Sequence, residues 1–201
     1  MTINCYPEQT AGNSLALFTD VSLNPGRRLG VGACLLVPAS FLDSAPDTIE
    51  RTDVSARLQF ERFAETSSTR LEVQTVLWAL KYYRAEINRS DSGRVQIYTD
   101  SQCVVGLPGR RAGLEANDFV AGRSGRPLIN TDLYRAFYAA HDQIGFELIK
   151  IKGHSRSGSH NSLQRIFSYV DQQVRGALKL WMGELADQDF HINPATPPSD
   201  P

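Results

Sequence analysis

The sequence has no cysteine arrangement suited to metal or redox chemistry. Its three cysteines, Cys5, Cys34 and Cys103, are odd in number and lie far apart, and there is no Cys-x-x-Cys pair. This excludes a cysteine-based zinc site and a dithiol redox centre. Because free thiols are usual in a reducing compartment, we expect a cytoplasmic protein.

Long apolar runs and an excess of one charge sign are also missing. No apolar run approaches the roughly 20 residues needed to cross a bilayer, and the N-terminus lacks the basic-then-apolar pattern of a signal peptide. We therefore expect no membrane partner. Because the formal net charge is −1, any nucleic-acid site has to be made by local basic residues or bound metal ions.

Internal repeats and a phosphate-binding P-loop are absent as well. With 201 residues, of which 41% are hydrophobic, the chain has enough apolar material for one core. We expect a single domain over residues 1–183. Residues 184–201 contain four acids, four prolines and no lysine or arginine, a composition that predicts a disordered acidic tail.

The first predicted strand covers residues 15–20, which read Leu-Ala-Leu-Phe-Thr-Asp. An apolar run of this kind is typical of a strand covered on both faces by helices, which indicates an α/β fold. Ligands of such sheets bind at the carboxyl ends of the strands, so Asp20 is a candidate catalytic acid. The alternative is a turn starter, because a turn at residues 24–26 leads into a second strand over residues 30–38.

A second acid follows another predicted strand. A long polar loop over residues 38–55 leads to a third strand near residues 57–64, and a fourth strand over residues 94–100 ends in Thr-Asp. A helical crossover between the first and fourth strands makes them parallel, with Asp20 and Asp100 at the same edge. The alternative for Asp100 is a cap of the short helix that follows it.

The crossover helix opens at residues 67–72. Glu72 lies in its first turn, beside the apolar stripe, and can point toward the strand ends. The alternative is a capping box, with Thr69 as the cap and Glu72 reaching back to its amide. The stripe follows the spacing i, i+3, i+4, i+7 and consists of Val73, Val76, Leu77 and Leu80.

Beyond the fourth strand, residues 109–127 read as a mobile, mildly basic loop that either connects elements or contacts phosphate. Asn130 or Thr131 then caps a helix that ends at Gly145, before a fifth strand over residues 146–152.

The last loop and helix carry the remaining candidates. Two histidines, His154 and His160, lie in the glycine- and serine-rich loop after the fifth strand. Asp171 adjoins the apolar stripe of the last helix, and its alternative role is an exposed acid paired with Arg175. The stripe consists of Leu163, Ile166, Phe167, Val170, Val174 and Leu178.

The order of these motifs resembles type 1 ribonuclease H over roughly residues 15–178. It implies a ribonuclease H-like fold, with a mixed five-stranded sheet in the order 3-2-1-4-5 flanked by helices. The motifs are Phe18-Thr19-Asp20-Val21-Ser22, Thr69-Arg70-Leu71-Glu72, Tyr98-Thr99-Asp100-Ser101-Gln102, Lys152-Gly153-His154 and Asp171.

The resemblance implies an endoribonuclease that hydrolyses the RNA strand of RNA/DNA hybrids and leaves 3′-hydroxyl and 5′-phosphate ends. Asp20, Glu72, Asp100 and Asp171 would hold two Mg²⁺ ions, with Mn²⁺ as a substitute, and His154 would transfer protons. The chemistry agrees, because Mg²⁺ prefers carboxylates and two ions about 4 Å apart serve phosphodiester cleavage. The implied contacts to the hybrid are Asn24, Ser67, Ser68, Thr69 and Gln102.

Three features depart from the family pattern. Val21 stands where glycine is usual, the lysine- and tryptophan-rich handle of some relatives is missing, and His154 and Asp171 are farther apart than usual. Two other functions remain open: a resolvase-like, structure-specific DNA endonuclease, and a non-catalytic hybrid-binding module, which would be expected to have lost a carboxylate. We expect a monomer.

Overall fold

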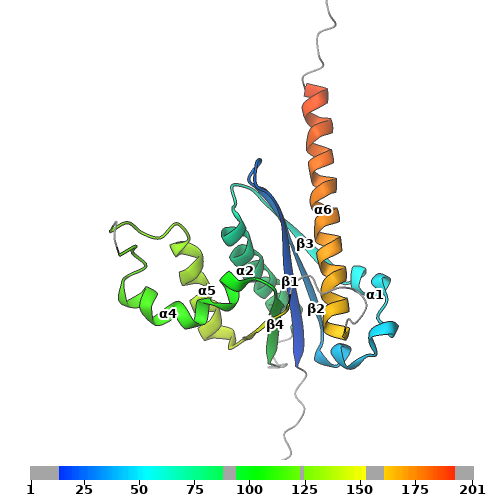
Figure 1. The fold of residues 1–201 in the computed structure, drawn as a ribbon, viewed down its shortest axis with the longest axis horizontal. Coiled ribbons are helices and arrows are strands. Elements are labelled where there is room, and N and C mark those ends of the chain that lie inside the picture. The colour runs from blue at the N-terminus through cyan, green and yellow to red at the C-terminus, as the bar shows by residue number, and fades with distance from the viewer. Residues whose placement is uncertain (1–13, 88–93, 123–124, 153–160, 193–201) are drawn as a thin grey trace, which may run out of the picture.

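The computed structural model describes residues 14–87, 94–122, 125–152 and 161–192 (Figure 1). Its centre is one five-stranded sheet in the order β3-β2-β1-β4-β5. β1 pairs antiparallel with β2 and parallel with β4, β2 pairs antiparallel with β3, and β4 pairs parallel with β5. The predicted mixed sheet and its strand order are confirmed. The strands are β1 (Leu15–Asn24), β2 (Leu29–Pro38), β3 (Leu58–Phe63), β4 (Val95–Thr99) and β5 (Glu147–Lys150).

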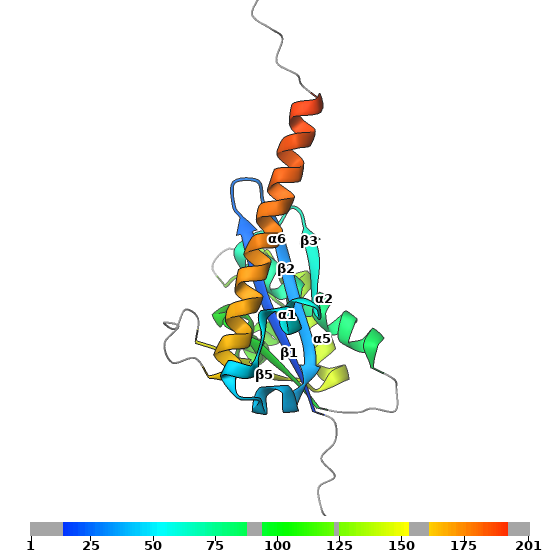
Figure 2. The same ribbon diagram turned by 90° about the vertical axis from the view of Figure 1, so that its right-hand side faces the viewer.

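Helices cover both faces of this sheet (Figures 1 and 2). α6 lies on one face, and α2 and α5 lie on the other. Ala16 and Phe18 pack in the core beneath α6, whereas Leu17 packs beneath α2, because successive strand residues point to opposite faces. The longer helices are α2 (Ser68–Glu86), α4 (Leu107–Ala116), α5 (Thr131–Ile144) and α6 (Ser162–Ile192), and α3 (Gln102–Val105) is a single turn.

Two glycines of β2 let α2 approach the sheet closely. A Cβ atom at Gly30 would collide with the Leu71 side chain, and one at Gly32 would collide with Thr75. Leu71 and Thr75 are fully buried in this contact. Since Glu72 follows Leu71 directly, the same contact sets the position of Glu72 over the sheet.

The connector between β2 and β3, residues 39–57, is more ordered than predicted. Instead of one long loop it contains η1 (Ala39–Asp43), η2 (Pro46–Thr48) and α1 (Arg51–Ser55). Ile49 and Val54 are buried and belong to the core cluster beneath α6. Two isolated apolar residues in a polar stretch carry no periodic signal, which explains why the sequence predicted a loop.

Residues 109–127, predicted as a mobile basic loop, are also partly helical, because α4 continues to Ala116 and the buried Phe119 packs against α5. Arg111 binds both Glu115 and Asp142. The positive charge that suggested a phosphate contact is therefore compensated at Arg111.

The last helix is longer than predicted. Its buried stripe is confirmed from Ile166 to Leu178, but α6 runs on to Ile192, so the disorder predicted from residue 184 is wrong as far as 192. The extension is anchored by Arg62 of β3, which binds Glu184 at 2.7 Å and lies over the Trp181 ring. Residues 193–201 lie outside the described residues.

None of the described helices combines the length and the apolar character needed to span a membrane.

Candidate active site

The parallel pair β1 and β4 brings two acids to one edge of the sheet. Their paired register ends at Phe18 and Tyr98, whose rings stack with centroids 4.9 Å apart. Asp100 follows the last residue of β4. Asp20 lies two residues beyond the end of the pairing, although β1 itself continues against β2 to Asn24. The prediction that the first strand ends at Asp20 is therefore wrong, and what ends there is the neighbouring strand.

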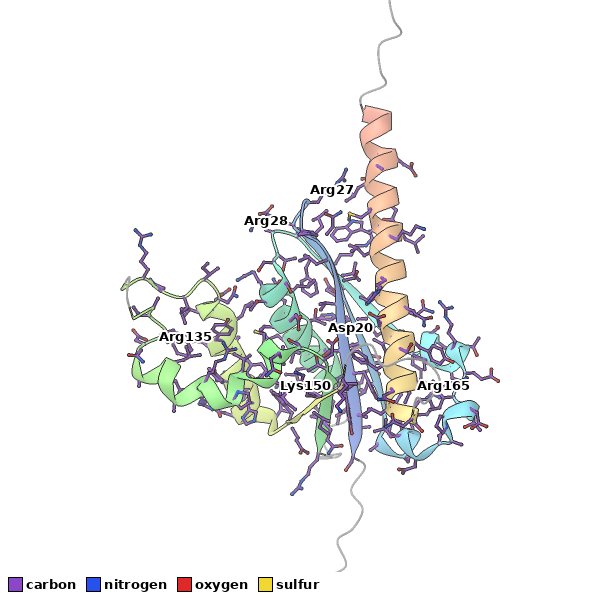
Figure 3. The ribbon with its side chains drawn as sticks, viewed as in Figure 1. Asp20, Arg27, Arg28, Arg135, Lys150 and Arg165 are labelled. Carbon is purple, nitrogen blue, oxygen red and sulfur yellow. The ribbon has the colours of Figure 1, made fainter. Side chains whose placement is uncertain are left out.

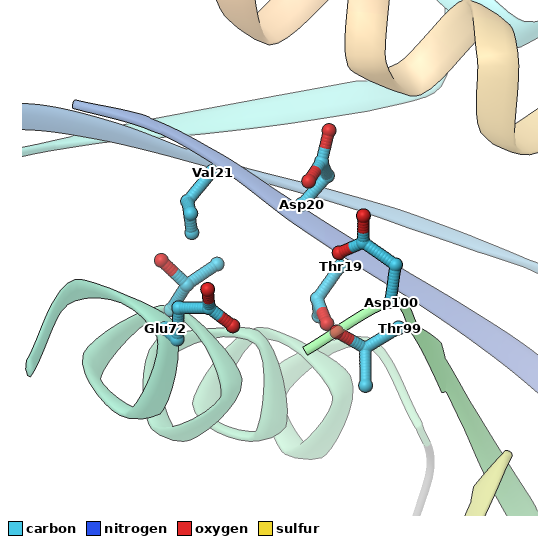
Figure 4. Close-up of a pocket in the computed structure, with 7 residues that line it drawn as sticks. Thr19, Asp20, Val21, Glu72, Thr99 and Asp100 are labelled. Atoms are coloured by element: carbon cyan, nitrogen blue, oxygen red, sulfur yellow. The ribbon is translucent and has the colours of Figure 1, made fainter. Parts of the chain in front are cut away.

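These acids line a pocket together with Glu72, which reaches it from α2 (Figure 4). The β1 residues come from the centre of the sheet, as Asp20 in Figure 3 shows. The complete lining consists of Thr19, Asp20, Val21, Glu72, Thr75, Thr99 and Asp100.

Glu72 does not act in a capping box. The N-cap of α2 is Ser67, which makes no side-chain cap bond, and the first turn contains no acid. Glu72 is therefore in the second turn. Burial raises the pKa of the Glu72 carboxyl, a hydrogen bond from the Ser101 hydroxyl opposes that rise, and the charge of Asp100 adds to it.

Asp100 does not cap the following helix either. The cap of α3 is Ser101, whose Oγ accepts a hydrogen bond from the backbone N–H of Val104 at 3.1 Å. Both structural alternatives for Glu72 and Asp100 are thus wrong, and the two side chains line the pocket instead.

Asp20 has the most strongly altered acidity of the group. Its residue is 8% exposed. Burial raises the pKa of the Asp20 carboxyl to about 8, a hydrogen bond from the Val21 backbone opposes the rise, and the charges of Asp100, Asp171 and Glu72 add to it. Four carboxylates therefore interact electrostatically at this edge of the sheet.

Asp171 reaches this group from the opposite layer. α6 begins with a reciprocal cap between Asn161 and Gln164, so Asp171 lies in the third turn of the helix rather than at its start. Its side chain is 26% exposed and accepts a hydrogen bond from Arg175 Nε at 2.9 Å. The predicted alternative, an i, i+4 ion pair, is confirmed, and it coexists with the electrostatic contact to Asp20.

Three buried polar atoms in or next to the pocket have no hydrogen-bond partner within the described residues: Thr19 Oγ1, Asp20 Oδ2 and Thr75 Oγ1. The threonines were not candidates in the sequence, because a threonine on an apolar strand or helix face carries no distinct signal. No three His, Cys, Asp or Glu side chains of the described part of the chain lie close enough together to form a metal site as they stand.

The implied substrate contacts lie at element ends. Ser67, Ser68 and Thr69 are at the start of α2. Asn24, at the end of β1, accepts a hydrogen bond from the Arg27 amide, and Gln102, at the start of α3, accepts one from Lys150. The contact of these residues with a hybrid stays a prediction.

The backbone at Val21, where the family usually has glycine, is part of the described structure, whereas the two loop histidines are not. The described non-glycine residues with positive φ are Arg28, Glu65, Asp118 and Phe119, so Val21 is not in a conformation that requires glycine. It lies opposite Gly32 in the register of β1 and β2. His154 and His160 lie outside the described residues.

A mixed sheet in this order, with acids gathered where β4 ends beside β1, defines a ribonuclease H-like domain. The RNase H family model matches residues 12–165, and the chain therefore belongs to the ribonuclease H family. That match ends six residues before Asp171. No curated protein sequence matches the chain.

Two solved structures are similar in fold. One is LC9-RNase H1, a type 1 RNase H with the type 2 active-site motif, with 18% identity and a TM-score of 0.55 over 82% of this chain and 72% of that chain. The other is the foamy viral protease-reverse transcriptase in complex with dsDNA, with 15% identity and a TM-score of 0.52 over 85% of this chain and 98% of that chain.

Proposed function

We propose that this protein is an endoribonuclease that hydrolyses the RNA strand of RNA/DNA hybrids with two Mg²⁺ ions. The observation that carries the proposal is the pocket at the edge of the sheet, which is lined by Asp20, Glu72 and Asp100. Family membership supports nuclease chemistry, and the four carboxylates expected for it are all present.

The residues of the pocket fit a hard divalent cation. Every charged candidate offers carboxylate oxygen, which Mg²⁺ prefers to nitrogen or sulfur. Asp20 Oδ2 is buried and has no hydrogen-bond partner among the described residues, so it is available as a ligand. Asp20, Glu72, Asp100 and Asp171 would hold the ions, which when bound supply charge stabilisation on both sides of the reacting phosphorus.

The charge state of Asp20 couples cation binding to pH. With a pKa of about 8, the carboxyl of the metal-free protein holds its proton at neutral pH. Cation binding requires the ionised form, so binding releases that proton. Burial is the main cause of this raised pKa, and the charges of Asp100, Asp171 and Glu72 add to it. A cation in the pocket would offset both effects, because it stabilises the ionised carboxylate.

The roles of the remaining residues are those that the resemblance to type 1 ribonuclease H implies. Short polar side chains at Asn24, Ser67, Ser68, Thr69 and Gln102 suit contacts to the minor groove of a hybrid, where the 2′-hydroxyl distinguishes RNA from DNA. His154 would transfer protons during cleavage, producing 3′-hydroxyl and 5′-phosphate ends.

The test is incubation of the protein in Mg²⁺ with end-labelled RNA/DNA hybrid, duplex RNA, duplex DNA and a four-way junction. We expect cleavage of the hybrid's RNA strand only, and no cleavage with Asp100→Asn. Cleavage of the junction or duplex DNA with an intact hybrid identifies a resolvase-like enzyme instead. Hybrid binding without cleavage identifies a non-catalytic binding module.

A further inference from the structure

The connector between β2 and β3, residues 39–57, lies along the first half of α6 in both views of the fold (Figures 1 and 2). Ile49 is 2% exposed and Val54 is fully buried, and both share a core cluster with Ile166 and Val170 of α6. The connector therefore packs on α6 through apolar contacts and is more than a link between two strands.

Hydrogen bonds between α6 and the connector add to these apolar contacts. Ser162 Oγ donates to the Ser44 carbonyl at 2.6 Å, near the start of α6. Arg165 Nε donates to the Ile49 carbonyl at 3.1 Å, and Figure 3 shows Arg165 at this end of the helix beside α1.

The third bond lies two turns further along. Gln173 Nε2 donates to Ser55 Oγ, at the end of α1, at 2.7 Å. The three bonds thus span residues 162–173, which is about 16 Å of helix at 1.5 Å per residue. Asp171 lies inside that span, so a slide or a rotation of α6 past the connector would have to break these bonds.

A small rotation of α6 would displace the Asp171 carboxylate considerably, because the carboxylate lies far from the helix axis. At roughly 5–6 Å from the axis, a rotation of about 20° moves the Asp171 carboxylate by about 2 Å. Metal–oxygen distances tolerate only a few tenths of an ångström. Asp20 lies in a hydrogen-bonded strand and Asp100 directly follows one, whereas the place of Asp171 depends on how α6 is docked.

We propose that the connector positions Asp171 for cation binding, with Gln173 as its principal positioning residue. Gln173 is two residues from Asp171 and so projects about 200° away around the helix. The connector therefore holds α6 from the side opposite the acidic group and fixes its rotation. This inference rests on the proposed function, since it takes Asp171 as a cation ligand.

The experiment compares Gln173→Met with Gln172→Met. The first change removes the bond to the connector while keeping the length of the side chain. The second is the matched control, because Gln172 Nε2 bonds to Ser168 Oγ within α6 itself. Calorimetric titration of the substrate-free protein with Mn²⁺ measures cation affinity directly.

For Gln173→Met we expect Mn²⁺ affinity to fall about tenfold, the loss typical when the support of a metal ligand is removed. The Mg²⁺ concentration for half-maximal hybrid cleavage should rise by a similar factor. Gln172→Met should stay close to the parent in both measurements. Ser55→Ala, which removes the same bond from the connector side, should reproduce the loss.

A double variant that combines Gln173→Met with Asp171→Asn tests whether the connector acts through Asp171. If the connector acts through Asp171, adding Gln173→Met to Asp171→Asn causes no further loss of Mn²⁺ affinity. An equal further loss, or equal effects of Gln173→Met and Gln172→Met, overturns the proposal. Because the titration needs no substrate, a parent protein that binds Mn²⁺ but cuts no hybrid overturns the proposed function and leaves the connector result intact.

Discussion

The acidic group has two sides that differ in how their charge is compensated. On the sheet side, Asp20 is 8% exposed, its Oδ2 atom has no hydrogen-bond partner in the described residues, and negative charges surround it. On the α6 side, Asp171 is partly exposed and paired with Arg175 one turn away. On the first side, burial and the neighbouring charges keep the Asp20 carboxyl protonated in the metal-free protein, whereas on the second side Arg175 compensates the charge of Asp171.

This difference assigns the two sides different tasks. Ionising a buried carboxyl is unfavourable in the metal-free protein and becomes favourable once a cation arrives, so the sheet side should dominate cation affinity. Asp171 can exchange its arginine for a cation at little expense, because an exposed pair of this kind stabilises a protein by only about 0.3–0.5 kcal/mol.

The largest effect is expected on the sheet side. Asp100→Asn should lower hybrid cleavage by several orders of magnitude, because it removes a direct ligand of the proposed ions. The melting temperature should stay unchanged or rise, since the Asp100 charge raises the pKa values of both Asp20 and Glu72. Single-turnover cleavage and thermal unfolding check both parts. Near-parental activity would remove Asp100 from the catalytic group.

On the α6 side, Asp171→Asn should reduce cleavage about ten- to hundredfold at limiting Mg²⁺, with partial recovery at high Mg²⁺. Asp187→Asn, which changes an exposed acid farther along the same helix, is the control and should behave like the parent. The measurement is hybrid cleavage across a Mg²⁺ titration. Loss in Asp187→Asn without loss in Asp171→Asn would show that the fourth ligand is assigned wrongly.

The stability of the metal-free protein should fall as pH rises from about 4 to about 8. The pKa of Asp20 is raised from 3.8 to about 8, so within this window the folded protein keeps a proton that the unfolded chain has released. The free energy of unfolding therefore decreases with pH and levels off above the folded pKa. Thermal unfolding at a series of pH values measures the slope.

Two changes should flatten that profile. Asp20→Asn removes the ionisation and should raise the melting temperature at pH 8, and excess Mg²⁺ should do the same by compensating the charge. Asp187→Asn should leave the slope as it is. A steep profile that persists in Asp20→Asn would mean that other groups cause it.

The smallest effect is expected for Arg175→Gln. Loss of the exposed pair with Asp171 should lower the melting temperature by about 1 °C. Mn²⁺ affinity should rise about twofold, because a positive charge beside the site is removed and its Coulomb energy across a wet surface is small. Arg175→Lys keeps the charge and serves as the control. A fall in affinity on Arg175→Gln would mean that Arg175 supports the site.

The sequence by itself determined the elements whose apolar residues form a continuous run or a periodic pattern. The strand at Leu15 is an unbroken apolar run, and the helix after Leu71 and the last helix up to Leu178 bury apolar residues at the 3.6-residue spacing. The Thr-Asp ending of β4 and a crossover helix were enough to bring Asp20 and Asp100 to one edge.

Tertiary structure decided what depends on contacts between distant segments. The connector folds because Ile49 and Val54 find the α6 core, and α6 continues past residue 184 because Arg62 of β3 binds Glu184. Thr75 reaches the pocket only because Gly32 leaves room for it. These features arise from pairs of residues far apart in the chain, and a local pattern cannot encode a contact whose second partner lies outside it.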